Sequence, residues 1–196
     1  MDFILDLLQA AGIAAAIGIR PLLPALLSGA LAAADIGLDF DNTDYSFLEQ
    51  WPFLLAVLVV VGALSVLARR AGPQAEERGP LALGLIAAGA AIAVLEGAGS
   101  MADRGHPLWT GYVVGAACFT LAAVVVRSLF GRVRRRLDAD TAAYLPLYGE
   151  GAALATCGLS ILFPPLAVLV IGGLVWLLIA GRRREGEKYA GLRILR

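Results

Sequence analysis

The chain has 196 residues, of which 59% are hydrophobic, and its mean hydropathy is +0.78. A soluble domain is nearer about 45–50% apolar, so the composition excludes a soluble globular protein and indicates an integral membrane protein. The formal net charge is zero, but the charges are segregated along the chain, and that segregation is more informative than their sum.

The first apolar segment, residues 7–34, is interrupted at Arg20-Pro21 in the sequence GIRPLLP, which ends with a second proline, Pro24. Proline lacks a backbone donor and clashes with the preceding turn, so no helix runs straight through this point. Each arm reaches only about 20 Å, whereas the hydrocarbon core is about 30 Å thick. We therefore expect a re-entrant hairpin of two helices. The alternative is a single tilted, kinked span with a cytoplasmic N-terminus.

Three single transmembrane helices are expected next, over residues 51–68, 80–102 and 108–130. A bilayer crossing takes about 20 residues, and each segment is close to that length. A fifth segment, residues 142–181, is interrupted at Phe163-Pro164-Pro165, where proline again prevents a continuous helix. Residues 182–196 form a basic tail.

The loops carry charges of opposite sign. Residues 35–50 contain five acids and no base, whereas residues 69–79, residues 131–141 and the stretch from Gly181 to the C-terminus contain three, four and six basic residues. Cytoplasmic loops carry the excess of Lys and Arg. We therefore expect a multi-pass protein of the inner (plasma) membrane, with its N-terminus outside and its tail in the cytoplasm. Since the 142–181 segment then begins and ends inside, it is expected to be a second hairpin.

The two interrupted segments resemble each other in sequence. GIRPLLPALL from Gly18 and GLSILFPPLA from Gly158 share the pattern G-(I/L)-x-x-L-(L/F)-P-x-L, which aligns Pro24 with Pro164. Three single spans separate them, so they enter from opposite faces, as in the inverted repeats of transporters. Chance similarity between apolar segments is the alternative. The expected fold is all-α: one transmembrane domain, residues 1–181, with three helices flanked by two Pro-broken hairpins in an inverted repeat.

Polar residues within apolar segments are functional candidates, because a charge at the bilayer centre costs at least about 2.5–3.5 kcal/mol. The expected hairpin tips are formed by Gly18, Pro21, Pro24, Gly158, Pro164 and Pro165. The candidate substrate-binding residues, expected to converge near mid-depth, are Arg20, Glu96, Glu150 and Ser160. Arg20 would hold an anionic group through two hydrogen bonds. The alternative is a buried strut in which Arg20 pairs with Glu96 or Glu150.

Two further polar sites have alternative interpretations. Glu96 is also a candidate proton carrier, because burial favours a neutral carboxyl; the alternative is a salt bridge near the outer interface. Asp103, Arg104 and His106 are expected to form a solvated outer turn closed by Pro107.

No metal, cofactor or nucleic acid is expected as a partner. His106 is the only histidine, and Cys118 and Cys157 lack the spacing of metal ligands, so both cysteines are expected to pack as small apolar side chains. The sequence contains no Ser/His/Asp set and no glycine-rich phosphate loop, which disfavours an enzyme without excluding one.

The chain resembles a family of small bacterial integral membrane proteins, the domain of unknown function 4126 family. The resemblance rests on GIRPLLPALL, LEGAGSMADRGHP and GEGAALATCGLSILFPPLA. This sequence departs from the family pattern at two positions: Arg104, where lysine is usual, and Gly151, where a second acid often follows Glu150. The departure at Gly151 weakens any prediction of a paired-carboxylate site there. The matched positions are Gly18, Arg20, Pro24, Glu96, Asp103, Arg104, Pro107, Glu150 and Pro164. The resemblance implies the architecture and no known activity.

The leading functional hypothesis is a transporter or flippase that moves a small anionic solute or an anionic lipid headgroup between the two hairpin tips. Opposed hairpins of this kind resemble those of several lipid-phosphate carriers and phosphatases, which is an analogy of fold alone. A passive channel with the tips as its constriction is the first alternative. A structural or assembly protein is the second. Membrane lipids are expected partners, and a homodimer is plausible because so small a chain encloses little space.

Overall fold

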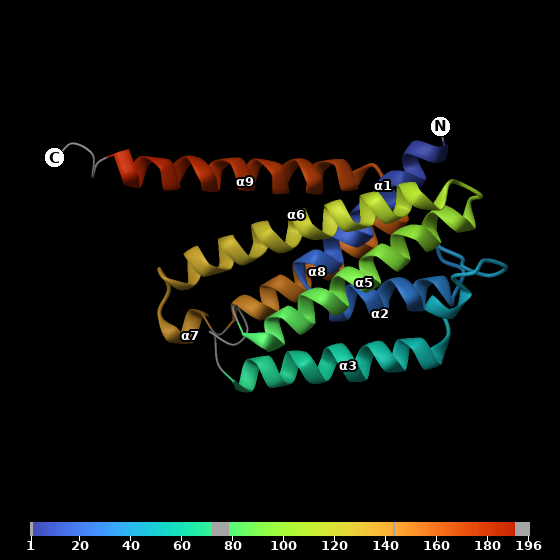
Figure 1. The fold of residues 1–196 in the computed structure, drawn as a ribbon, viewed down its shortest axis with the longest axis horizontal. Helices are drawn as coiled ribbons and strands as arrows, with labels where there is room; N and C mark the ends of the chain where they lie inside the picture. Colours follow the sequence, from blue (N-terminus) through green and yellow to red (C-terminus); the bar gives the residue numbers. More distant parts are fainter. Residues whose placement is uncertain (1, 72–78, 143, 191–196) are drawn as a thin grey trace.

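The computed structural model describes residues 2–71, 79–142 and 144–190 (Figure 1). All regular secondary structure in this part of the chain is helical, which confirms the all-α prediction. Its helices, in chain order, are α1 (Asp2–Ile19), α2 (Leu22–Ala32), the short 3-10 helix η1 (Ser46–Leu48), α3 (Trp51–Arg70), α5 (Pro80–Asp103), α6 (Leu108–Arg134), α7 (Ala139–Ala142), α8 (Leu145–Leu162) and α9 (Leu166–Ala190). Within the described ranges, α3, α5, α6 and α8 are long and apolar enough to cross a membrane.

Helix α1 is the centre of the bundle. Its residues from Ala10 to Ile17 are all buried, and most of them are Ala or Ile with no exposed surface. A helix that is apolar on every side is stable only when it is surrounded. Accordingly α1 packs against α2, α5, α6, α8 and α9.

The first interrupted segment turns back on itself. Helix α1 ends at Ile19. The N–H of Arg20 still donates to the Ala16 carbonyl at 3.1 Å, but Pro21 has no N–H to continue the helical hydrogen bonds. After α2 the chain returns to the beginning of α1, since Gln9 Nε2 donates to the Gly37 carbonyl at 2.7 Å. Its arms differ from the expected 7–19 and 21–34: α1 begins at Asp2, and α2 ends at Ala32.

The second interrupted segment is also an antiparallel pair. Helix α8 ends at Leu162 beside the same loop, where Gln9 Nε2 also lies 3.3 Å from the Ile161 carbonyl oxygen. Helix α9 then runs back until Gly181, where a Cβ would lie 2.8 Å from Nη1 of Arg132. No structural boundary lies at 181, because α9 continues as one helix to Ala190. The rest of the expected tail, residues 191–196, lies outside the described residues.

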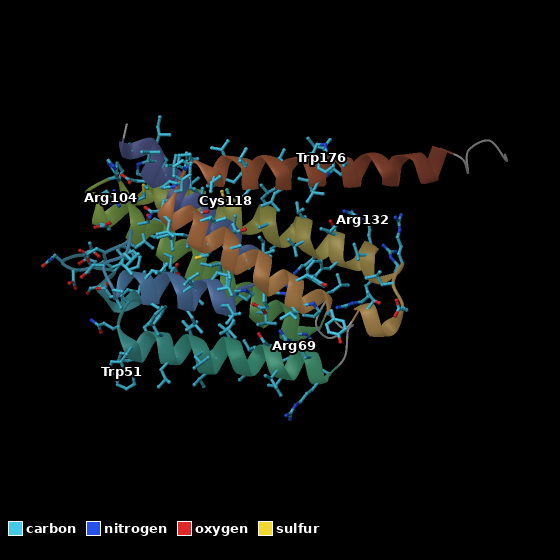
Figure 2. All side chains as sticks on the ribbon, turned by 180° about the vertical axis from the view of Figure 1, so that it is seen from behind. Trp51, Arg69, Arg104, Cys118, Arg132 and Trp176 are labelled. Carbon is cyan, nitrogen blue, oxygen red and sulfur yellow. The ribbon has the colours of Figure 1, made fainter. Side chains whose placement is uncertain are left out.

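The two ends of the bundle differ in charge. One end, here called the acidic end, carries residues 33–50 and 104–107; the other, the basic end, carries the C-terminal turns of α3 and α6. Figure 2 shows Trp51 and Arg104 toward one end, and Arg69 and Arg132 toward the other. The single helices extend slightly beyond the expected 51–68, 80–102 and 108–130, because their polar terminal residues continue the helix.

Candidate functional site

The break between α1 and α2 packs tightly against α5 and α6. A Cβ on Gly18 would lie 2.5 Å from the Phe119 carbonyl oxygen, so only glycine lets α1 approach α6 this closely. On the other side, Cβ of Pro21 lies 3.1 Å from the Cβ position of Gly89 on α5. These contacts hold the backbone on both sides of Arg20 in place and so determine the position from which its side chain projects.

Arg20 lines a pocket of about 90 Å³ between the break, α5 and α6. Two more arginines, Arg127 and Arg134, line the same pocket. They lie on one face of α6 with Phe130 between them, because residues three and four apart share a helix face. The Arg20 guanidinium carbon lies 5.7 Å from the Phe130 ring centroid, within cation–π range. The rest of the wall is glycine, Pro21 and apolar side chains such as Ile17, Leu85 and Ile86.

The pocket has the chemistry of an anion site. None of the described lining residues is acidic. Arg127 is exposed, and Arg20 and Arg134 are half-buried. All three take part in further interactions within the protein, so an anion would join an existing network. Guanidinium groups donate paired, charge-assisted hydrogen bonds to carboxylates and phosphates. The volume is also several times the roughly 10–15 Å³ that one water molecule needs.

Glu150 lies next to this site but does not line the pocket. A Cβ on its neighbour Gly149 would lie 3.2 Å from Nε of Arg20. The Glu150 carboxylate forms an ion pair with Arg69 of α3, with 3.5 Å between Oε1 and Nη2. This pair ties the beginning of α8 to the end of α3.

Ser160 lies far from Arg20, so the expected meeting of the two hairpin tips is wrong. The Ser160 hydroxyl fills the space that a side chain on Gly12, in the middle of α1, would occupy. Gly149 faces Arg20 but precedes Ser160 by 11 residues, or about 16 Å of helix. Helices α1 and α8 pack antiparallel, and this places the break after α1 and the break after α8 at opposite ends of the pair.

The other expected tip residues are also separate from the pocket. Gly158 makes only ordinary contact, with its Cβ position 3.8 Å from Leu27, so no close approach requires glycine there. Pro24 contacts the middle of α8, where its carbonyl oxygen lies 3.5 Å from Sγ of Cys157. Pro164 and Pro165 form the α8–α9 turn at the acidic end.

Glu96 is buried in the middle of the bundle, 1% exposed. It faces the Ser28 hydroxyl of α2 and lies close to Cys157 of α8. Its Oε2 atom and the Ser100 hydroxyl, one turn later on α5, have no hydrogen-bond partner among the described residues. No described residue forms an ion pair with Glu96, so neither a strut to Arg20 nor a salt bridge near the outer interface exists.

The 103–107 turn is not simply solvated. Asp6 is 3% exposed, and Nη1 of Arg104 and Nε2 of His106 each lie 3.1 Å from one of its carboxylate oxygens. The His106 ring also packs edge-on against Phe3. This cluster fastens the beginning of α1 to the α5–α6 turn. It was not predicted, because nothing in the sequence signals a contact across about a hundred residues.

The 33–50 loop holds a second polar group at the acidic end. The carboxylate oxygens of Asp39, Asp41 and Glu49 lie within 4.8 Å of one another, and burial with these neighbours raises the pKa of Glu49. Burial and a hydrogen bond with Tyr112 raise the pKa of Tyr45 to about 12. The contact between the two tyrosine hydroxyl groups fastens the loop to α6.

Sequence reasoning missed two of the three arginines in the pocket. The expected helix ends at residue 130, which leaves Arg134 in the basic 131–141 loop, whereas in the structure α6 continues to Arg134 and places it on one face with Arg127. Nothing in the local sequence pattern indicates that this face of α6 contacts the break at Arg20.

No family model, curated protein or solved structure matches this chain. The resemblance to the family named above therefore stays a prediction.

Proposed function

We propose that the protein is a membrane transporter or flippase and that the pocket at the α1–α2 break binds the anionic group it moves. The observation that carries this proposal is the convergence of Arg20, Arg127 and Arg134 on one pocket with no acidic residue in its described lining. Three guanidinium groups, each with interactions inside the protein, give the lining a positive character that favours an anionic group.

An anionic lipid headgroup fits this pocket better than a free solute. The arginines supply donors for a phosphate, and the adjoining wall of Ile17, Leu85 and Ile86 suits an acyl chain or glycerol backbone. The pocket also reaches Arg134, the last residue of α6, which is where a headgroup would meet a spanning helix. We place this end at the cytoplasmic face of the inner membrane because basic residues concentrate there.

The wider arrangement supports the proposal. The α1–α2 pair opens toward the acidic end and the α8–α9 pair toward the basic end, as an inverted repeat would require. Both the repeat and a homodimer are part of the proposed arrangement. Exposed apolar residues on α9, such as Leu169 and Trp176, provide a surface for lipid or for a second copy.

Binding to purified protein in detergent tests the pocket directly. Inorganic phosphate and phosphatidylglycerol are the probes for a free anion and for a lipid. Arg20→Gln, Arg127→Gln and Arg134→Gln should each weaken binding at least about tenfold, because a hydrogen bond to a charged group is lost. Arg20→Lys should retain part of the affinity, since charge survives without the planar fork. Arg135→Gln is the matched control on the same helix, because Arg135 lies outside the pocket lining.

Movement is tested in vesicles that contain fluorescent phosphatidylglycerol or phosphatidylcholine. Wild-type protein should speed the exchange of the anionic lipid between leaflets more than that of the zwitterionic lipid, and the three glutamine variants should lose that acceleration. Equal binding and equal exchange by wild-type protein and all three variants would contradict the proposal. Saturable uptake of phosphate without lipid exchange would favour the free anion, and non-saturable phosphate flux would favour a channel.

A further inference from the structure

The strongest feature outside the pocket is the buried group around Glu96. A carboxylate with 1% exposure and no basic partner is very costly in charged form, and such a group instead takes up a proton. The facing groups are Ser28 from α2 and Cys157 from α8. The described residues of α1, α3, α6 and η1, which also pack against α5, bring no charged or titratable group to it.

The Ser28 hydroxyl is already used within its own helix. It donates to the Pro24 carbonyl at 2.9 Å, with the Ala25 carbonyl at 3.1 Å. A hydroxyl has one proton to donate, so while Ser28 donates to α2 it supplies no proton to an ionised Glu96, whereas a neutral carboxyl has a proton of its own and needs none. An ionised Glu96 would require Ser28 to turn its proton away from Pro24.

Helix α2 connects this group with the pocket. Pro21 lines the pocket and immediately precedes α2, and Ser28 follows seven residues later, two turns along the same helix. Cys157 donates to the same Pro24 carbonyl, so α8 also holds this part of α2. A change at Glu96 therefore acts on the helix that directly follows the pocket-lining Pro21.

We propose that Glu96 is a proton-binding site whose protonated state holds α2 against α5 and α8, so that loss of the proton loosens the α1–α2 pair and couples proton movement to the pocket. In this step the O–H bond of the Glu96 carboxyl breaks, the electron pair stays on the carboxylate, and the proton passes to water. The coupling rests on the proposed anion function, whereas the proton site itself does not.

Infrared spectroscopy of the purified protein tests the protonation state. At pH 7 the wild-type spectrum should contain a protonated-carboxyl stretch that is absent from Glu96→Gln. This variant keeps the size of the side chain and resembles the protonated form, so it should fold. Identical carboxyl bands in the two proteins would overturn the proposal.

The native Cys157 reports on the loosening of α2. In a Cys118→Ser background, labelling of Cys157 by a maleimide should rise with pH more steeply in wild-type protein than in Glu96→Gln. An ionised Glu96 would repel the nearby Cys157 thiolate and slow labelling of the wild type, so a ratio of wild-type to variant rate that rises with pH reports the loosening and not the thiol's own ionisation. Ser28→Ala, which removes the hydroxyl that faces Glu96, should label faster than wild type at low pH. A constant ratio across the pH range would overturn the proposal.

These measurements use no anion. Loss of the infrared band and of the pH-dependent labelling would therefore remove the proton site, while the phosphate and phosphatidylglycerol experiments above decide separately on the pocket.

Discussion

At the scale of single residues, buried charge in this protein follows two patterns. The Asp6 carboxylate contacts Arg104 and His106, whereas Glu96 has no ion-pair partner among the described residues. The first pattern stabilises a junction between distant segments. The second places a carboxyl without an ion pair in the interior, which is the group that we propose binds a proton.

Asp6→Asn should lower stability, because the substitution removes two charge-assisted contacts from a buried acceptor. We expect a loss of about 1–3 kcal/mol, measured as a lower midpoint of thermal unfolding in detergent. Asp103→Asn is the matched control: Asp103 also contacts Arg104, with 3.0 Å between Oδ2 and Nε, but this pair is at the surface. The control should change stability by less than about 1 kcal/mol. Equal effects would show that Asp6 does not fasten α1 to the turn.

At the scale of helices, packing depends on glycine at the crossing of α5 and α6. A Cβ on Gly111 would overlap the Gly97 carbonyl, one on Gly97 would lie 2.8 Å from the Gly111 carbonyl oxygen, and one on Gly115 would lie 2.7 Å from the Ala93 carbonyl oxygen. In a membrane there is little hydrophobic force between helices, so such close backbone contact supplies much of the attraction.

Gly111→Ala should therefore separate α5 from α6. Overpacking of this kind costs about 1–3 kcal/mol, and the thermal midpoint in detergent should fall accordingly. Gly172→Ala is the control, since a Cβ at Gly172, within α9, meets nothing within 4 Å. It should leave stability unchanged or slightly raised, because alanine favours helix. If both variants behaved alike, the close crossing would not contribute to stability.

At the scale of the whole molecule, charge is divided between the two ends, and the pocket belongs to the basic one. Arg69 and Arg132 lie toward that end, opposite Arg104 and the acidic 33–50 loop (Figure 2). An anion entering from the basic end would meet a field that attracts it before it reaches Arg134 and Arg20.

Orientation in the membrane follows from the same division. In a protein without Cys118 and Cys157, Asn42→Cys should be labelled from outside intact cells by an impermeant maleimide. Thr141→Cys should be labelled only after permeabilisation, because the basic end is expected in the cytoplasm. Labelling of both positions from one face would contradict this orientation.

Much of the architecture was determined by the sequence alone. Apolar length predicted α3, α5 and α6 to within a few residues, because a run of about 20 apolar residues has few alternatives to a spanning helix. Proline predicted both breaks, since a missing donor and a steric clash act locally. Arg20 was predicted to be a functional residue because a charge within an apolar membrane segment is energetically costly.

Only the tertiary structure decided which of these residues meet. A helical pattern shows which residues share a face, but not which neighbour that face contacts or at what register. The antiparallel packing of α1 on α8 separated Ser160 from Arg20, and the close approach at Gly18 brought Arg20 to Arg127 and Arg134. The groups that face Glu96, Ser28 of α2 and Cys157 of α8, are distant from it in sequence. Side-chain partnership across helices depends on packing of the whole bundle, and no local segment contains that information.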